Sequence, residues 1–152
     1  MKTLLMIYDS QTGRTHKLIH AAHEGACGAA EGMDVLLKCA HEVDVDVLRQ
    51  ADAWLLATPE NFGYMSGELK AMFDRTYDAV RETTAGRSYA LLVSCGNDGR
   101  GAQSAVERIM LGYGMHRARE TLIVRGEVSE ADVLAAHELG QYMAVALSMG
   151  LI

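Results

Sequence analysis

The chain has 152 residues, of which 49% are apolar, 22% are charged and only one is a proline. This composition fits one globular domain over residues 1–152 and excludes a disordered chain. The formal net charge of −6 argues against nonspecific nucleic-acid binding, which needs a surplus of Lys and Arg. No apolar run approaches the roughly 20 residues that span a bilayer, so we expect no membrane association and a cytoplasmic location.

The first third of the chain alternates apolar runs with a helical pattern. Thr3 to Tyr8 predicts a first strand, and Met33 to Cys39 predicts a second, buried strand. Residues 43–52 fit either an alternating strand or a short connecting helix, and we favour the helix. Between the two strands, apolar residues recur at intervals of three and four and mark a helix that Gly28 and Gly32 close: Leu18, Ile19, Ala22, Ala26 and Ala30.

The clearest helix of the chain follows its most continuous apolar strand. Ala53 to Thr58 is uninterrupted by charge, which is typical of a strand covered on both faces. From Ser66 to Glu82 an apolar stripe recurs with helical spacing, and acidic residues fall on the opposite side. The stripe consists of Leu69, Met72, Phe73, Thr76, Tyr77 and Val80, and the acidic residues are Glu68, Asp74 and Asp78.

The remaining elements continue the same alternation. Ser88 to Ser94 predicts a fourth strand, and an apolar face from Ala102 to Tyr113 predicts a helix that ends at nearby glycines. Residues near Arg117 to Val124 predict a fifth strand, and Ser129 caps a last helix that reaches Leu147. Strands that alternate with helices predict an α/β fold with a parallel sheet wrapped on both faces.

Three loops that follow strands have an unusual composition, and they are Asp9 to Thr15, Pro59 to Gly67 and Cys95 to Gly101. Ligands of open parallel sheets bind at the carboxyl ends of strands, so we expect one site built from all three. The first loop supplies hydroxyls and amides for a phosphate, the second supplies a flat apolar surface, and the third supplies bare backbone. This combination fits FMN better than a dinucleotide, because neither GxGxxG nor a Walker lysine is present.

The residues of two loops resemble a known family. Ser10 to Thr15 looks like the T/S-x-T-G-x-T phosphate loop of flavodoxins, and Thr58 to Lys70 resembles the corresponding loop and helix start of flavodoxin-like quinone and FMN reductases. The resemblance covers essentially the whole chain. It implies a three-layer flavodoxin-like sandwich, with a five-stranded parallel sheet in the order 2-1-3-4-5 and FMN bound noncovalently at its carboxyl edge.

The same resemblance implies which residues hold the cofactor. Ser10, Gln11, Thr12, Gly13, Arg14 and Thr15 would surround the phosphate; Thr58, Pro59, Glu60, Asn61, Phe62 and Gly63 would border the ring, and Ser94, Cys95, Gly96, Asn97 and Gly99 would lie on its other side. Main-chain amides near Asn97 and Gly99 are expected to stabilise the negative charge of reduced flavin.

One departure from the electron-carrier flavodoxins suggests an activity. Those proteins usually place aromatic side chains from the second and third loops on the ring, but residues 94–101 contain no aromatic residue. An open ring face suits a nicotinamide or quinone that must stack there. We therefore expect an oxidoreductase that passes hydride from NAD(P)H through FMN to a quinone, flavin or similar acceptor, with no catalytic side chain.

Two other functions remain open from the sequence. The first is a flavodoxin-type electron carrier that serves a redox partner protein and has no NAD(P)H reductase activity of its own. The second is a binding or regulatory module that keeps the fold and holds FMN weakly. Apolar side chains on the helices could also serve an interface between copies, which leaves a homodimer or homotetramer open.

The cysteines favour free thiols. Cys27, Cys39 and Cys95 are odd in number and scattered, which suits a reducing compartment. Cys95 is interpreted as a small residue beside the ring and not as a redox thiol, because no resolving cysteine is near it. The spacing from Cys95 to Arg100 differs from the Cys-x5-Arg loop of low-molecular-weight phosphatases. Arg100 either pairs with a nucleotide phosphate or is solvated.

Two further site classes are disfavoured. A phosphorylation-receiver domain shares the strand order but needs an aspartate at the end of the third strand, where this chain has Thr58 and Pro59. His16, His20 and His23 fall at helical spacing, yet no set of carboxylates or cysteines with ligand spacing joins them, so we expect no metal site.

Overall fold

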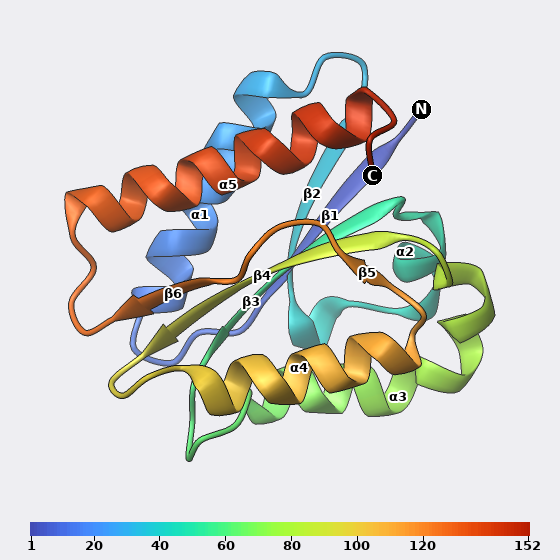
Figure 1. Ribbon diagram of the computed structural model, residues 1–152. Helices are drawn as coiled ribbons and strands as arrows, with labels where there is room; N and C mark the ends of the chain where they lie inside the picture. The colour runs from blue at the N-terminus through green and yellow to red at the C-terminus, as the bar shows by residue number, and fades with distance from the viewer.

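The computed structural model describes residues 1–152 and places a parallel sheet between two layers of helices (Figure 1). The sheet order is β2-β1-β3-β4-β5, and β6 also pairs with β4. The predicted α/β fold and strand order are therefore confirmed. In chain order the elements are β1 (Thr3–Tyr8), α1 (Arg14–Ala29), β2 (Asp34–Cys39), a 3-10 turn (Ala40–Glu42), α2 (Val45–Gln50), β3 (Ala53–Pro59), α3 (Gly67–Thr84), β4 (Ser88–Cys95), α4 (Arg100–Gly112), β5 (His116–Arg117), β6 (Leu122–Arg125) and α5 (Glu130–Ser148).

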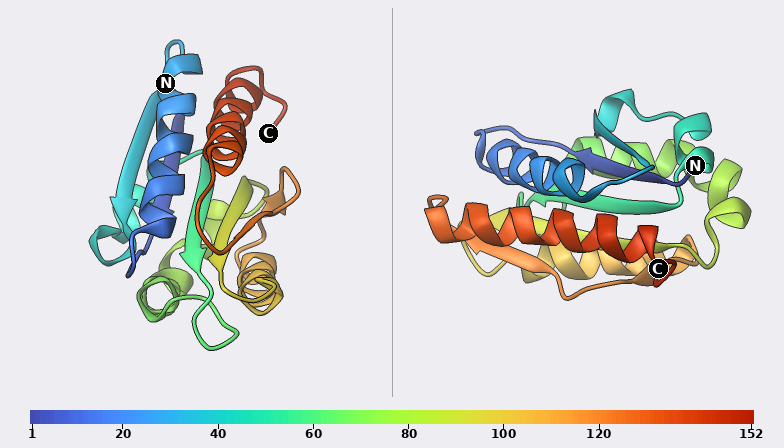
Figure 2. Two further views of the ribbon diagram at one scale, coloured as in Figure 1. Left: turned by 90° about the vertical axis from the view of Figure 1, so that its left-hand side faces the viewer. Right: turned by 90° about the horizontal axis from the view of Figure 1, so that it is seen from above.

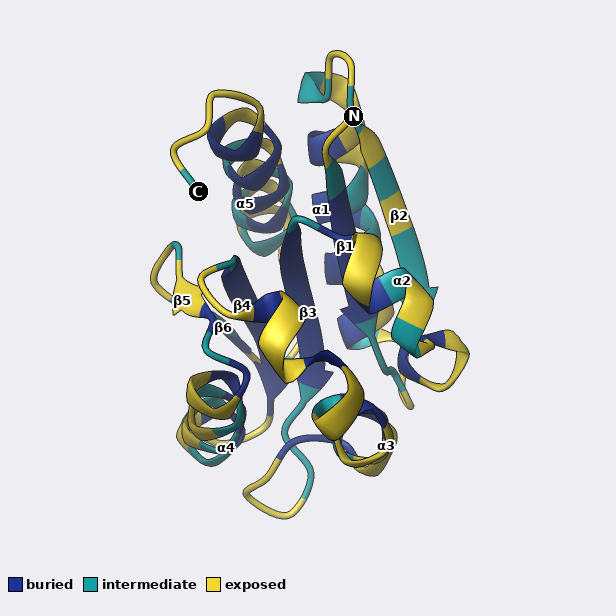
Figure 3. Ribbon diagram, turned by 90° about the vertical axis from the view of Figure 1, so that its right-hand side faces the viewer, coloured by how far each residue is buried: buried dark blue, intermediate teal, exposed yellow.

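The strands β3 and β4 form the buried centre of the molecule. Every residue of β4 is buried, and so is every residue of β3 except Pro59. Helices α1 and α5 cover one face of the sheet, and α3 and α4 cover the other (Figure 2). Both faces of the central strands are thus removed from water, which explains why their sequences are continuously apolar (Figure 3).

The second strand lies at the edge of the sheet, so the prediction of a buried strand there was wrong. β2 pairs with β1 alone, from Thr3 opposite Asp34 to Tyr8 opposite Cys39. Its residues are exposed or half-buried, and Leu36 is 36% exposed. An apolar run does not by itself distinguish a central strand from an edge strand, because that difference depends on which strands pair.

The predicted fifth strand is divided in two. β5 pairs with β4 at Ser88 and Tyr89, and β6 pairs with β4 from Leu92 onward. Five residue steps separate Arg117 from Leu122, whereas three separate their partners Tyr89 and Leu92, so the edge strand carries two extra residues. These residues bulge outward toward α5, where the Tyr142 hydroxyl donates a hydrogen bond of 3.2 Å to the Ala118 carbonyl.

Polar side chains begin three of the helices. Asp44 accepts a hydrogen bond from the Val47 amide at 2.9 Å, and the short helix that we favoured for residues 43–52 is confirmed as α2. Ser66 accepts from the Leu69 amide at 3.2 Å, and Ser129 accepts from the Asp132 amide at 3.2 Å. Each side-chain cap satisfies a backbone donor that the first turn of a helix leaves free.

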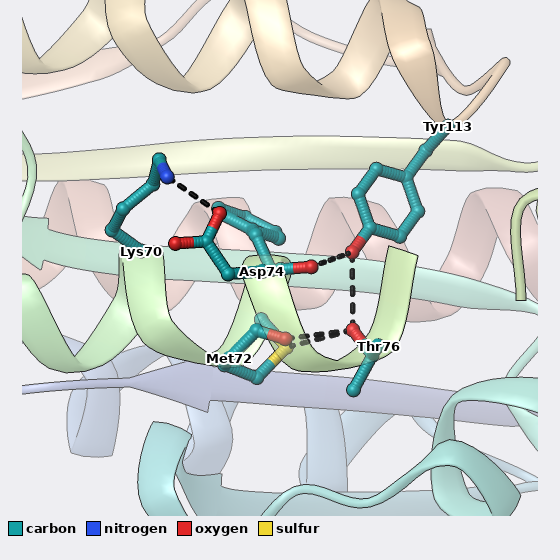
Figure 4. A network of polar contacts seen from close by, with 6 residues as sticks. Lys70, Met72, Asp74, Thr76 and Tyr113 are labelled. Carbon is teal, nitrogen blue, oxygen red and sulfur yellow. Dashed lines mark hydrogen bonds and ion pairs between the residues drawn. The ribbon is translucent and has the colours of Figure 1, made fainter. Parts of the chain in front are cut away.

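A buried polar cluster joins the end of α4 to α3 (Figure 4). The Tyr113 hydroxyl lies 3.0 Å from Thr76 Oγ1 and 3.1 Å from the Phe73 carbonyl oxygen. Burial raises the pKa of Tyr113 to about 12, so the hydroxyl stays neutral and keeps its proton for these bonds. The cluster holds the C-terminal end of α4 against the core. It thereby helps to fix the orientation of the helix, whose N-terminal end lies at the third loop.

Helices α1 and α5 approach so closely at Gly25 and Gly140 that no Cβ atom fits at either position. A Cβ atom added to Gly140 would lie 1.8 Å from the Ala22 carbonyl oxygen, and one added to Gly25 would lie 2.1 Å from the His137 carbonyl oxygen. Neither contact is with a flexible side chain, so the backbones themselves would have to separate.

We therefore expect Gly140→Ala to lower the free energy of unfolding by about 1–3 kcal/mol, as overpacking does in a core. The matched control is Gly28→Ala on the exposed side of α1, where no atom lies within 4 Å of an added Cβ. Removing a helical glycine there should raise the free energy of unfolding by about 0.5–1 kcal/mol. Urea denaturation measures both changes, and equal stability of the two variants would contradict the close approach.

Candidate functional site

The three loops expected to form the site meet at one edge of the sheet. They leave the carboxyl ends of β1, β3 and β4, which are neighbours in the sheet. A cavity of about 140 Å³ lies between them and is lined by residues of all three loops. All nine lining residues are among those predicted to hold the cofactor: Gln11, Thr12, Arg14, Pro59, Glu60, Asn61, Ser94, Cys95 and Gly96.

Helix α1 begins beside this cavity with backbone donors that the protein leaves free. Its N-cap is Gly13, which has a left-handed φ of 96° and no side chain to cap the first turn. Ser10 Oγ accepts a hydrogen bond from the His16 amide at 3.2 Å, but no protein acceptor meets the amides of residues 12–15. Free N–H groups and the positive end of the helix dipole together favour a bound anion.

Thr15 links the first loop to the third. Its side chain is buried, and Oγ1 lies 2.9 Å from Ser94 Oγ at the end of β4. Sequence reasoning placed the Thr15 hydroxyl on a phosphate and did not foresee this partner. Of the two threonines in the loop, Thr12 is the exposed one and lines the cavity, so it is the cleaner probe of anion binding.

The second loop contains a tight turn that holds an aromatic ring in solvent. Asn61 and Tyr64 exchange two backbone hydrogen bonds of 2.8 and 3.0 Å around Phe62 and Gly63. Both central residues are left-handed, with φ values of 52° and 70°, and the Phe62 side chain is fully exposed. A left-handed residue with a side chain costs roughly 1–2 kcal/mol, and such strain is found at ligand-binding loops.

Glu60 connects the second loop to the start of α4. Its carboxylate accepts hydrogen bonds from the amides of Gly99 at 3.3 Å, Gly101 at 3.0 Å and Ala102 at 3.2 Å. Its own amide donates to the Ser94 carbonyl at 2.8 Å. The carboxylate therefore caps α4 in place of a side chain at Gly99, where the helix begins.

This contact was missed by sequence reasoning. We expected Glu60 to border the ring and the Gly99 amide to stabilise reduced flavin, but in the structure these two groups bind each other. They are 39 residues apart in the chain. A glycine at the start of a helix signals that a cap must come from elsewhere, although it does not say from which residue.

The Cys95 thiol is packed inside the protein and is not exposed to solvent. Its thiol is buried, with Sγ 3.5 Å from the Asn97 carbonyl and 3.7 Å from the Val124 carbonyl. Burial, reinforced by the nearby Glu60 carboxylate, raises the pKa of the Cys95 thiol. The reactive thiolate is thereby disfavoured, which supports the interpretation of Cys95 as a small packing residue.

The histidines of α1 lie outside the cavity. The rings of His16 and His20 are 4.0 Å apart between centroids, and both stand edge-on to Tyr8. Burial, followed by the charge of His16, lowers the pKa of His20. Nowhere in the structure are three His, Cys, Asp or Glu side chains placed to hold a metal ion, and none of its helices could cross a membrane.

We expect Glu60→Gln to lower the free energy of unfolding by about 1–3 kcal/mol, because an amide cannot accept all three bonds and points an N–H at a backbone N–H. The control is Glu82→Gln on the exposed side of α3, which makes no hydrogen bond and should change stability by less than about 0.5 kcal/mol. Urea denaturation of both variants tests the cap. If Glu60→Gln behaves as Glu82→Gln does, the carboxylate does not hold the two loops together.

One family model and several known proteins are similar to this chain. A family model described as NADPH-dependent FMN reductase matches residues 45–128. A flavodoxin from Aquifex aeolicus (strain VF5) is 31% identical over 110 residues, which cover 72% of this chain and 59% of that protein.

The chain thus spans about 59% of the length of this curated relative. Two solved structures share the fold over nearly all of both chains. A flavodoxin from the domain Archaea superposes with a TM-score of 0.81 at 19% identity, covering 96% of this chain and 99% of the other. A WrbA-like flavodoxin from Agrobacterium tumefaciens gives a TM-score of 0.76 at 18% identity, covering 98% and 99%. The chain belongs to the flavodoxin-like, FMN-binding family that the NADPH-dependent FMN reductase model describes.

Proposed function

We propose that this chain binds FMN between its three loops and transfers hydride from NAD(P)H to a quinone, a flavin or a similar acceptor. The observation that carries the proposal is the uncapped start of α1 beside a cavity lined by all three loops. A phosphate there would receive the backbone hydrogen bonds that no protein group supplies. The match to the NADPH-dependent FMN reductase model supports the same cofactor and the same electron donor.

The residues present fit this cofactor. Ser10 and Thr12 add hydroxyls to the free amides of the first loop, which suits the phosphate end. Gly96 lines the cavity and Gly13 begins α1 beside it, and at both positions an added Cβ would meet no atom within 4 Å. When bound, FMN accepts a hydride and passes the electrons on.

In this reaction the protein would bind and orient the FMN and leave one face of its ring accessible to the reactants. Glu60 holds the second and third loops at a fixed separation through three backbone amides. The third loop has no aromatic side chain to cover a ring, and Phe62 of the second loop points into solvent. Both features favour a ring face open to a nicotinamide or a quinone, and such stacking brings the reacting atoms together.

A flavodoxin-type electron carrier is the second candidate. It is favoured by the likeness to the flavodoxin from Aquifex aeolicus. Both candidates require FMN, but only the reductase requires direct reaction with a nicotinamide.

The experiment that tests the function mixes the FMN-loaded protein with NADPH or NADH in the absence of oxygen. We expect the yellow absorbance of oxidised flavin to bleach rapidly, and to return when a quinone is added. If the flavin bleaches only after a separate reductase protein is added, the proposed reductase function is overturned and the electron-carrier function is retained. If no FMN binds, both redox functions are lost.

Thr12→Val tests the phosphate end directly. Loss of one charge-assisted hydrogen bond should weaken FMN binding about tenfold while the fold is kept. Thr83→Val on the exposed side of α3 is the matched control and should leave FMN affinity unchanged. Fluorescence titration measures both affinities, and an unaltered value for Thr12→Val would remove that hydroxyl from the site.

A further inference from the structure

A second and larger cavity lies next to the three-loop site. It occupies about 620 Å³ between α4 and the edge strand β6, a size typical of small-molecule sites. Its lining is mainly polar and consists of Arg100, Gln103, Ser104, Glu107, Glu120, Thr121, Leu122, Ile123 and Arg125. We call these residues the edge groove. None of the residues expected to surround the FMN phosphate lines this groove, and Arg100 is the only residue of the three loops that does.

The edge groove lies in the one strongly basic part of an acidic protein. Residues 100–125 contain five arginines and two glutamates, a balance of +3, whereas the whole chain carries −6. Arg100 and Arg125 are exposed and form no ion pair, so their charges are uncompensated. Both acidic residues line the groove: Glu107 is paired with Arg117 at 2.6 Å, and Glu120 is exposed and forms no ion pair.

The two free arginines lie at the end of the groove nearest the cofactor loops. Arg100 lies within the third loop, directly after Gly99, and is the first residue of α4. Arg125 is the register partner of Cys95, where that loop begins. In Figure 1 the start of α4 and the end of β6 lie at the same end of the sheet as the three loops.

The remainder of the groove offers neutral hydrogen-bonding groups. Gln103 and Ser104 lie one turn into α4, and the Thr121 hydroxyl is one of two buried side-chain polar atoms in the protein without a partner. The bulge that separates β5 from β6 places Thr121 at the groove. Two cations at one end and neutral polar groups beyond them match a nucleoside whose phosphates face the cofactor loops.

We propose that the edge groove binds the adenosine diphosphate half of NAD(P)H, with Arg100 and Arg125 on the pyrophosphate. The inference deepens the proposed reductase function and rests on it. A dinucleotide held this way extends its nicotinamide past the third loop, toward the side of the cofactor site that carries no aromatic residue. Guanidinium groups suit this role because they bind phosphate oxygens in pairs.

The first test uses ADP alone and does not depend on turnover. Isothermal titration of the full chain, loaded with FMN, should show ADP binding that Arg100→Gln and Arg125→Gln each weaken about tenfold. The matched control is Arg108→Gln, which removes an exposed arginine of the same helix that does not line the groove. Its affinity for ADP should stay within twofold of the unaltered protein, and thermal melting confirms that each variant is folded.

The second test separates recognition from chemistry. In steady-state turnover, the double variant of Arg100 and Arg125 should raise the KM for NADPH at least tenfold and leave kcat and the FMN affinity unchanged. ADP bound by the double variant as tightly as by the unaltered protein overturns the groove. So does an unchanged KM.

The two proposals fail in different ways. If NADPH does not reduce bound FMN but ADP still requires the two arginines, the reductase function is overturned and the nucleotide site stands. If NADPH reduces FMN with equal KM in both proteins, the reductase stands and the edge groove is overturned.

Discussion

The parallel pairing of β1, β3 and β4 decides where every candidate functional group of this protein lies. Parallel neighbours point their carboxyl ends to the same edge, so the loops that follow them must emerge side by side. The central strands are buried on both faces and cannot bind anything along their length. The hydroxyls, glycines and aromatic residues of the three loops are gathered at the carboxyl edge of the sheet, beside the small cavity.

Helices α1 and α4 both start at this edge, but their first turns differ in whether the backbone N–H groups are free. The first turn of α1 has free backbone donors, and that of α4 is satisfied by the Glu60 carboxylate. An anion that is bound by free backbone amides is therefore directed to the first turn of α1 and not to that of α4. The same carboxylate ties the second loop to the third, so the part of the site that would face a ring is fixed before any ligand arrives, which lowers the entropy lost on binding.

The charged side chains are also distributed unevenly over the protein. The chain as a whole is acidic, yet residues 100–125 are basic and lie along one edge of the sheet. Glu107 is neutralised by Arg117, while Arg100 and Arg125 keep their charges beside the third loop. An anionic donor would be drawn to that edge at long range, since unpaired charges raise the local concentration of a ligand of opposite sign.

The order of the elements and the three loops that line the small cavity could be predicted from the sequence. Periodicity predicted the buried stripe of α3, and serines predicted the starts of α3 and α5. The resemblance to flavodoxin-like proteins included all nine residues that line the small cavity, and loop composition included all of them except Ser94. These features are local, because a few neighbouring residues specify a helix cap or the buried face of a helix. The tertiary structure was needed to show that the residues of β2 are exposed or half-buried, that the fifth strand breaks around two extra residues, and that Glu60 caps α4. Each of these features depends on contacts between segments that are far apart in the chain. Such contacts produce no repeating residue pattern from which they could be predicted.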